Sequence, residues 1–123
     1  MEKREHDMEY DNFMKTYQQG ITNGEQVGCL IARLAQHFAT TNMKLAAKRV
    51  LLNIVELGNV NEIDDVTGKQ VSVAKANVMT SSSQENIEYK EEETHLKNIE
   101  NYINSLKNLQ KGILNEYSHV SAI

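Results

Sequence analysis

The stretch of sequence that decides the fold is residues 23–57, NGEQVGCLIARLAQHFATTNMKLAAKRVLLNIVEL. Apolar residues recur along it at steps of three and four positions, which places them on one face of an α-helix. The members of this first stripe are Val27, Ile31, Leu34, Phe38, Leu45, Leu52 and Val55. A capping box of Thr22 and Glu25 predicts the start of the helix, and Gly58 predicts its end. A break at residues 40–42 stays open, because Thr-Thr-Asn is a poor helix former.

Residues 82–118 predict a second long helix of nearly the same length. Its apolar residues also recur at steps of three and four, and they are Leu96, Ile99, Ile103, Leu106, Ile113, Tyr117 and Val120. A capping box of Ser82 and Glu85 predicts its start. Two long helices of matched length predict an antiparallel hairpin that resembles a coiled coil.

The distribution of charge supports this antiparallel hairpin. Residues 23–57 carry four basic and two acidic residues, whereas residues 82–118 carry four basic and seven acidic ones. Aligning the two helices from the loop outward places Lys48 opposite Glu91. Exposed ion pairs of this kind contribute only about 0–1 kcal/mol each, so they select the orientation of the helices rather than stabilise the hairpin.

Two short helices and a loop account for most of the remaining chain. The first short helix is predicted at residues 2–19, where the apolar face contains Met8, Phe13, Met14 and Tyr17 and Gly20 ends the helix. The second is predicted at residues 72–79, with Ser72 as its N-cap. Between the long helices, residues 58–71 predict a loop with a turn at residues 65–68. An alternative for this region stays open, a small hairpin that pairs Val71 and Val73 with Val60 and Ile63.

These elements predict a single all-α domain over residues 1–123, a helical bundle built on two long amphipathic helices. The composition agrees, because the chain has no proline, which would break a long helix. The absence of proline also excludes collagen-like chains and proline-rich linkers. One cysteine among 123 residues excludes a disulfide scaffold and a cysteine-based zinc site.

Wide apolar faces on the two long helices predict self-association. A second stripe widens the face of the first long helix toward its C-terminal end, and it consists of Met43, Ala47, Val50, Ile54 and Leu57. Tyr102 and Leu109 flank the main stripe of the second long helix. Two short helices cover such faces poorly, so a homo-oligomer is expected, with a dimer favoured. Gly28 and Gly112 fall near one level of the hairpin, which predicts a close helix contact.

The sequence shows no recognised catalytic, cofactor or metal motif. The four histidines, His6, His37, His95 and His119, have no cysteine, histidine or carboxylate at a known metal-ligand spacing. The expected position of His95 is a polar flank facing Lys44. Glu91, Glu92 and Glu93 point in different directions on a helix, so they are expected to form a solvated face. Cys29 is expected to be half-buried. The chain is therefore predicted to be no enzyme and to bind no cofactor or metal.

Two stretches resemble small phage-encoded helical proteins. Residues 98–117, NIENYINSLKNLQKGILNEY, look like the C-terminal helix of such proteins, and residues 68–76, GKQVSVAKA, are similar to their middle portion. The resemblance covers roughly the last 55 residues and carries no catalytic motif. It implies a phage or prophage accessory protein that acts by contact with another protein, in the cytoplasm of an infected bacterium or in a virion.

The predicted function is therefore that of a helical interaction or assembly protein with an unknown protein partner. Its candidate interaction surface contains Lys44, Lys48, Arg49, Tyr102 and Leu109. An alternative is a nucleic-acid-associated accessory protein that uses the basic face from Lys44 to Arg49, although the chain as a whole carries a net charge of -4. No apolar run approaches the ~20 residues that span a bilayer, so a cytoplasmic protein without membrane contact is expected.

Overall fold

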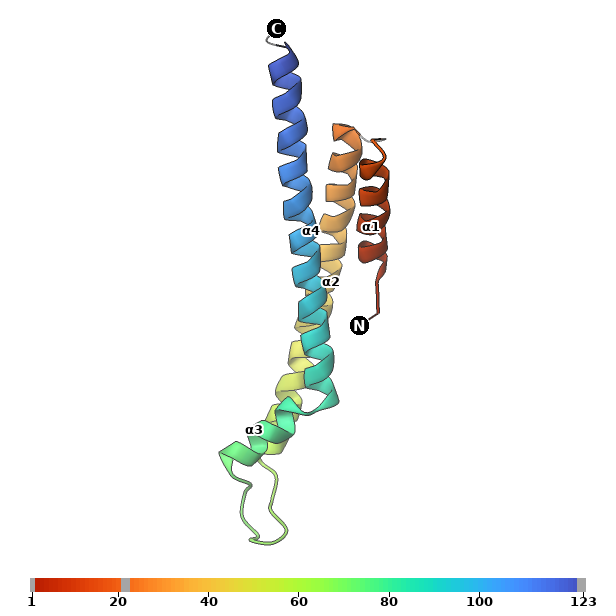
Figure 1. The fold of residues 1–123 in the computed structure, drawn as a ribbon. Coiled ribbons are helices and arrows are strands. Elements are labelled where there is room, and N and C mark those ends of the chain that lie inside the picture. Colours follow the sequence, from red (N-terminus) through yellow and green to blue (C-terminus); the bar gives the residue numbers. More distant parts are fainter. Residues whose placement is uncertain (1, 21–22, 122–123) are drawn as a thin grey trace. The chain divides into compact units, whose positions relative to one another are not determined.

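The structure is a computed structural model that describes residues 2–20 and 23–121, with side chains described as far as residue 114. Within these residues the chain forms four α-helices: α1 (Glu5–Gln18), α2 (Gly24–Val60), α3 (Val73–Ser81) and α4 (Gln84–Ser121) (Figure 1). The all-α prediction is confirmed, and all four helices lie within a few residues of their predicted bounds.

The chain divides into two compact units. The first contains Met1–Thr40 and His95–Ile123, and the second contains Thr41–Thr94. Because α2 and α4 each contribute residues to both units, a single helical domain over residues 1–123 stays a prediction. Each unit is described by itself below.

In the first unit, α1, the N-terminal part of α2 and the C-terminal part of α4 lie side by side (Figure 1). The core consists of fully buried leucine, isoleucine and valine side chains from the two long helices, namely Val27, Leu30, Leu34, Ile99 and Leu106. An added methyl group at Gly24 would lie 3.7 Å from Ile113, and the side chain of Gln110 lies beside Gly28. These neighbours show that α2 and α4 run antiparallel here, as the sequence predicts.

The buried face of α1 differs from the predicted one. Met8 and Tyr17 are exposed, whereas His6 and Asp7 are buried and Phe13 packs against the core. The side chain of Tyr10 also packs there. The prediction was wrong at Met8 and Tyr17 because it ranked residues by their apolar character. In the folded unit, Asp7 finds hydrogen-bond donors that offset the loss of water.

In the second unit, the C-terminal part of α2 packs beside α3 and the N-terminal part of α4. Its described buried apolar residues are Leu52, Val71 and Ala76. Lys48 pairs with Glu88 at 3.8 Å, not with Glu91. The predicted register of α2 against α4 was wrong by about one helical turn. It assumed that the helix ends align, whereas side-chain packing between the helices sets the register.

Several helix ends lie one or two residues from their predicted positions. The capping box of α2 uses Asn23 and Gln26: the Gln26 N–H donates to the Asn23 side chain at 3.0 Å, and the Asn23 N–H donates to the Gln26 side chain at 3.2 Å. The predicted partner Thr22 lies outside the described residues. Helix α2 continues past Gly58 to Val60 and has no break at residues 40–42. Favourable neighbouring residues carry the helix through these weak positions.

The start of α4 is also shifted by one residue. The Ser83 hydroxyl accepts from the Asn86 N–H at 3.2 Å, so Ser83 is the capping residue. Ser82, the predicted cap, instead ends α3, and its hydroxyl donates to the Val78 carbonyl at 2.8 Å. A run of serines offers several equivalent caps, and the positions of the two helices choose among them.

The segment between α2 and α3 forms a tight loop. Asp64 starts its turn: its carboxylate accepts from the Val66 N–H at 2.8 Å, and its carbonyl accepts from the Gly68 N–H at 2.8 Å. Gly68 has φ +69°, a conformation that favours glycine. The alternative hairpin is reduced to one isolated bridge between Ile63 and Gln70. The predicted α3 forms, with the Ser72 hydroxyl accepting from the Lys75 N–H at 3.1 Å.

In the part of the chain that the structure describes, no helix has both the length and the apolar character needed to cross a membrane.

The shifted cap gives a direct test of the junction between α3 and α4. We expect Ser83→Ala to lower the free energy of unfolding by about 1 kcal/mol, because it removes the N-cap of α4. The neighbouring change Ser82→Ala should cost clearly less, since Ser82 caps no helix N-terminus. Chemical denaturation followed by circular dichroism measures both. A larger loss for Ser82→Ala would contradict the observed cap.

Candidate functional site

An apolar face of α2 is exposed in the second unit. Seven positions from Met43 to Leu57 lie within an arc of about 140° around the helix, and all are exposed. We call them the outer face of α2: Met43, Ala46, Ala47, Val50, Leu51, Ile54 and Leu57. The five large side chains among them, which exclude the two alanines, keep 52% to 75% of their surface accessible. The second stripe seen in the sequence therefore faces outward rather than into the chain's own core.

The second unit exposes more large apolar side chains than it buries. Its described buried apolar residues are only three, Leu52, Val71 and Ala76. Large exposed ones also occur outside the outer face, at Val60, Ile63, Val66, Val73, Val78 and Ile87. Among the described side chains of the first unit, the large exposed apolar ones are Met8, Tyr17 and Leu114. Contiguous exposed apolar surfaces of this kind are a common feature of contact sites in proteins.

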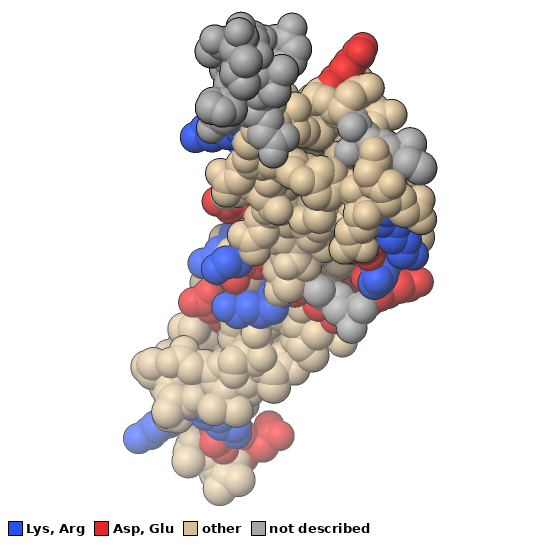
Figure 2. Space-filling model, turned by 45° about the horizontal axis from the view of Figure 1, so that its top comes forward, with Lys and Arg blue, Asp and Glu red and all other residues tan. Residues whose placement is uncertain are grey.

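The basic residues of the predicted interaction surface lie beside this outer face and are mostly engaged. Lys48 pairs with Glu88, and the guanidinium of Arg49 lies 5.5 Å from the ring centre of Tyr89. Lys44 is exposed. On the face drawn in Figure 2, the described Lys and Arg side chains are interspersed with Asp and Glu. These contacts weaken the case for a nucleic-acid surface, which needs a continuous basic patch.

The two remaining residues of the predicted surface belong to the first unit. Leu109 is half-buried and packs against the core. Tyr102 stacks on Tyr10 with ring centres 4.2 Å apart, and its hydroxyl donates to Asp7 at 2.6 Å. Both side chains are therefore used inside the unit. The structure does not bring them together with Lys44, Lys48 and Arg49 into one compact unit.

The close helix contact predicted at Gly28 and Gly112 does not form within this chain. A methyl group added at Gly28 would lie 3.6 Å from the Gln110 side chain, which is an ordinary contact. A methyl group added at Gly112 would have nothing within 4 Å. Gly28 therefore faces the end of a flexible side chain, and Gly112 faces open space.

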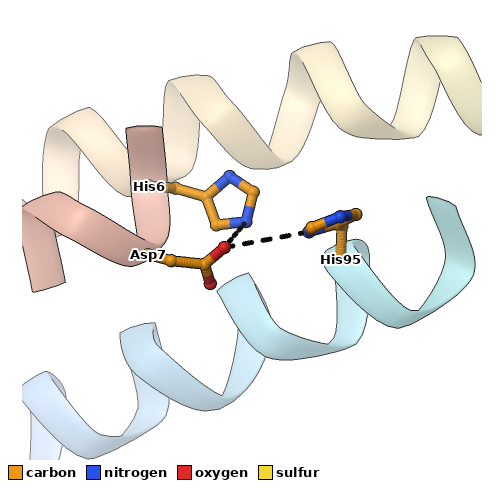
Figure 3. A group of neighbouring side chains, drawn as sticks. All are labelled: His6, Asp7 and His95. Atoms are coloured by element: carbon orange, nitrogen blue, oxygen red, sulfur yellow. Dashed lines mark ion pairs between the residues drawn. The ribbon is translucent and has the colours of Figure 1, made fainter. Parts of the chain in front are cut away.

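A buried polar cluster lies in the first unit, between α1 and α4. His6 and Asp7 come from the first turn of α1, and His95 comes from α4 (Figure 3). The His6 Nε2 lies 3.5 Å from the Asp7 Oδ2, and the His95 Nδ1 lies 3.9 Å from the same oxygen. Each histidine is only 3% exposed. The rings of His6 and His95 meet edge to face, with centres 5.3 Å apart.

Hydrogen bonds hold the Asp7 carboxylate in place. Its Oδ1 accepts from the Tyr102 hydroxyl, and its Oδ2 accepts from the Arg4 N–H at 2.9 Å. Burial raises the pKa of Asp7, but these two hydrogen bonds and the nearby histidines outweigh it, so the pKa lies below its usual value. Burial, with the hydrogen bond to Asp7, raises the pKa of Tyr102. Asp7 is therefore a buried carboxylate that keeps its charge.

The environment of His6 favours its neutral form. Burial lowers the pKa of His6, and the nearby His95, His37 and Arg4 lower it further, against the opposing effect of Asp7. Next to this cluster, His37 Nε2 lies 3.1 Å from the Glu9 carboxylate, and Arg33 approaches the same carboxylate at 3.9 Å. Three of the four histidines thus gather around the start of α1.

The sequence did not reveal this cluster. His6 and His95 lie on helices that are far apart in the chain, so no local spacing links them. The expectation that His95 lies on a polar flank was wrong, because the face of α4 that contains it packs against α1. The adjacent Glu92 is buried rather than solvated. Cys29 is exposed, not half-buried.

Comparison with protein-family models, with curated proteins and with solved structures found no match to this chain. The resemblance to small phage-encoded helical proteins therefore stays a prediction.

The buried cluster predicts that acid destabilises the first unit. Unfolded His6 has a pKa near 6.5, whereas the folded value is lower, so the unfolded chain binds more protons as the pH falls. The stabilising contribution of neutral His6 is therefore complete above about pH 6.5 and is lost as the pH falls toward the folded pKa. The folded pKa of Asp7 is also lowered, so protonation of Asp7 reduces the free energy of unfolding further at more acidic pH.

Chemical denaturation at a series of pH values, in metal-free buffer, tests this expectation. The wild-type free energy of unfolding should fall between about pH 7.5 and about pH 5.5. In His6→Gln, whose amide does not titrate, the slope over this range should be smaller. Equal slopes for the two proteins would show that His6 does not cause the loss.

Proposed function

We propose that this protein is a non-enzymatic helical interaction protein that self-associates through the outer face of α2. The observation that supports the proposal is the exposed apolar stripe from Met43 to Leu57. This stripe has the geometry of a helix contact, and no other described element of its own unit covers it. The protein would then act by contact with other chains rather than by catalysis.

The spacing of the stripe favours another helix as its occupant. Its central positions, 43, 47, 50, 54 and 57, alternate steps of four and three. This average of 3.5 residues is the repeat with which two helices pack knobs into holes. The charged residues nearest to it, Lys44 and Arg49, lie at its margins, as expected for positions that flank a helix interface.

A second copy of this chain is the occupant that we favour. A two-fold axis would bring two identical stripes together, and each would cover the other. Full burial of a large apolar side chain is worth about 1.5–3 kcal/mol, and these side chains are already partly covered. The two stripes together are therefore worth on the order of 10 kcal/mol, which is similar to the cost of association, about 4–15 kcal/mol. We expect a dimer that depends on protein concentration.

A further protein partner is part of the same proposal. Apolar residues in the loop and on α3 of the second unit are exposed outside the outer face, among them Val66 and Val78. They offer a contact surface that self-association through α2 does not need. The resemblance of residues 68–76 and 98–117 to phage-encoded helical proteins supports a partner from an infected bacterium or a virion.

The outer face can be tested with a matched pair of substitutions. We expect wild-type protein to approach twice the chain mass of 14.0 kDa as its concentration rises, and Ile54→Glu to remain monomeric at the same concentrations. The buried glutamate would have no partner at the centre of the interface, which costs several kcal/mol. Sedimentation equilibrium measures the mass of both proteins.

The control substitution is Val66→Glu. Val66 is an exposed β-branched residue of the same unit, 93% accessible, and it lies in the loop away from the outer face. This variant should dimerise like the wild type. A wild-type protein that is monomeric at all concentrations would overturn the proposal. Equal loss of dimer in both variants would place the contact elsewhere in the second unit.

A further inference from the structure

We propose that His6, Asp7 and His95 bind one divalent metal ion of the zinc class, which joins α1 to α4 in the first unit. The three side chains converge on one point from two helices, as Figure 3 shows. Each offers one ligand atom, and these atoms all lie within 4.8 Å of one another. The site is independent of the outer face of α2, which belongs to the second unit.

The set of donors suits zinc and its neighbours among the transition metals. Two imidazole nitrogens and one carboxylate oxygen are ligands that Zn²⁺ and Co²⁺ accept, whereas Mg²⁺ and Ca²⁺ prefer oxygen alone. With three ligands from the protein, a water molecule would complete a tetrahedral shell. The buried position of all three side chains protects such a site from competing solvent.

The separation of each histidine nitrogen from the Asp7 oxygen is close to the one that a tetrahedral ion requires, and all three ligand atoms lie within 4.8 Å of one another. Ligand atoms about 2.1 Å from a tetrahedral ion lie about 3.4 Å from one another. The 3.5 Å between His6 Nε2 and Asp7 Oδ2 already matches this separation. The 3.9 Å between His95 Nδ1 and the same oxygen exceeds it by about half an ångström, which a small rotation of the imidazole removes.

The chemical state of the ligand atoms also fits a metal site. His6 Nε2 is buried, and it makes no hydrogen bond with any residue that the structure describes. A buried ring nitrogen without such a bond is costly, and a metal ion in the centre of the cluster would satisfy it. Asp7 is held from behind by the Tyr102 hydroxyl, as the carboxylate ligands of metal sites usually are.

A second group of possible ligands near α1 fits less well. Glu5, Glu9 and His37 also lie within reach of one ion, but Glu5 is exposed and the other two are half-buried. Moreover, His37 Nε2 already meets the Glu9 carboxylate at 3.1 Å, and Arg33 balances the charge of that carboxylate. These residues therefore form a surface ion-pair group, and His37 serves as the control for the buried site.

Metal binding would fix the position of α1. This helix has only 14 residues, and a helix of that length is marginal in water by itself. An ion held by His6 and Asp7 on one side and His95 on the other would tie its first turn to α4. The metal-bound protein should therefore melt at a higher temperature and show slower amide exchange in α1.

Titration of the metal-free protein with ZnCl₂ in competition with a chromogenic chelator tests the site. We expect one Zn²⁺ per chain, and CoCl₂ should give the strong visible absorption of tetrahedral Co²⁺. His6→Gln, Asp7→Asn and His95→Gln should each weaken binding by more than about 100-fold, the upper end of what outer residues cause. Tyr102→Phe should weaken it by about 10–100-fold, because the Tyr102 hydroxyl holds the ligand Asp7 but is not itself a ligand.

The control variant His37→Gln should bind Zn²⁺ as the wild type does. Loss of binding in His37→Gln but not in His6→Gln would assign the metal to the surface group and overturn the proposal. Absence of stoichiometric Zn²⁺ binding by wild-type protein would also overturn it. If a substitution in the buried cluster unfolds the chain, X-ray absorption spectroscopy of the wild-type zinc complex still tests the site. The proposal requires two imidazole ligands, with oxygen atoms as the remaining ligands.

Discussion

The packing of the first apolar stripe of α2 against α4 is the interaction on which the rest of the structure depends. In the first unit this contact fully buries Val27 and Leu34 of the stripe, together with the neighbouring Leu30, against Ile99 and Leu106. Each buried side chain of this size contributes about 1.5–3 kcal/mol, far more than any exposed ion pair. In the second unit, Leu52 continues the same stripe. The face of each long helix that this contact buries decides which other faces remain available for further contacts.

Two different kinds of surface remain once that stripe is buried. In the first unit, α1 packs against the long helices with a partly polar face. On this face the Asp7 carboxylate accepts hydrogen bonds from the Tyr102 hydroxyl and the Arg4 N–H. In the second unit, the outer face of α2 stays apolar and exposed. We propose a metal ion as the ligand of the first surface and another helix as the partner of the second. The two proposals rest on these separate surfaces, so either can hold without the other.

Much of the fold could be predicted because its signals are local. Three of these signals act within a few residues of themselves: the period of Val27, Leu34 and the rest of the first stripe, the glycine at position 20 and the serine at position 72. Errors of one residue, such as Ser82 for Ser83, arose where adjacent residues had equal capping ability. The register of Lys48 was wrong by one turn, because it depends on packing between helices that the pattern of one helix does not contain.

The sequence by itself determined the helices, their antiparallel pairing and the presence of a second apolar stripe on α2. The helices and the stripe follow from side-chain periodicity, which is a property of each segment alone, whereas the antiparallel pairing follows from the matched lengths and the opposite charges of the two long helices. Only the tertiary structure decided that this stripe faces outward and that His6, Asp7 and His95 meet. The physical reason is that both facts depend on how separate helices pack together. That packing decides which face of each helix is buried. The docking of α1 against α4 turns a carboxylate and two distant histidines into a single buried cluster.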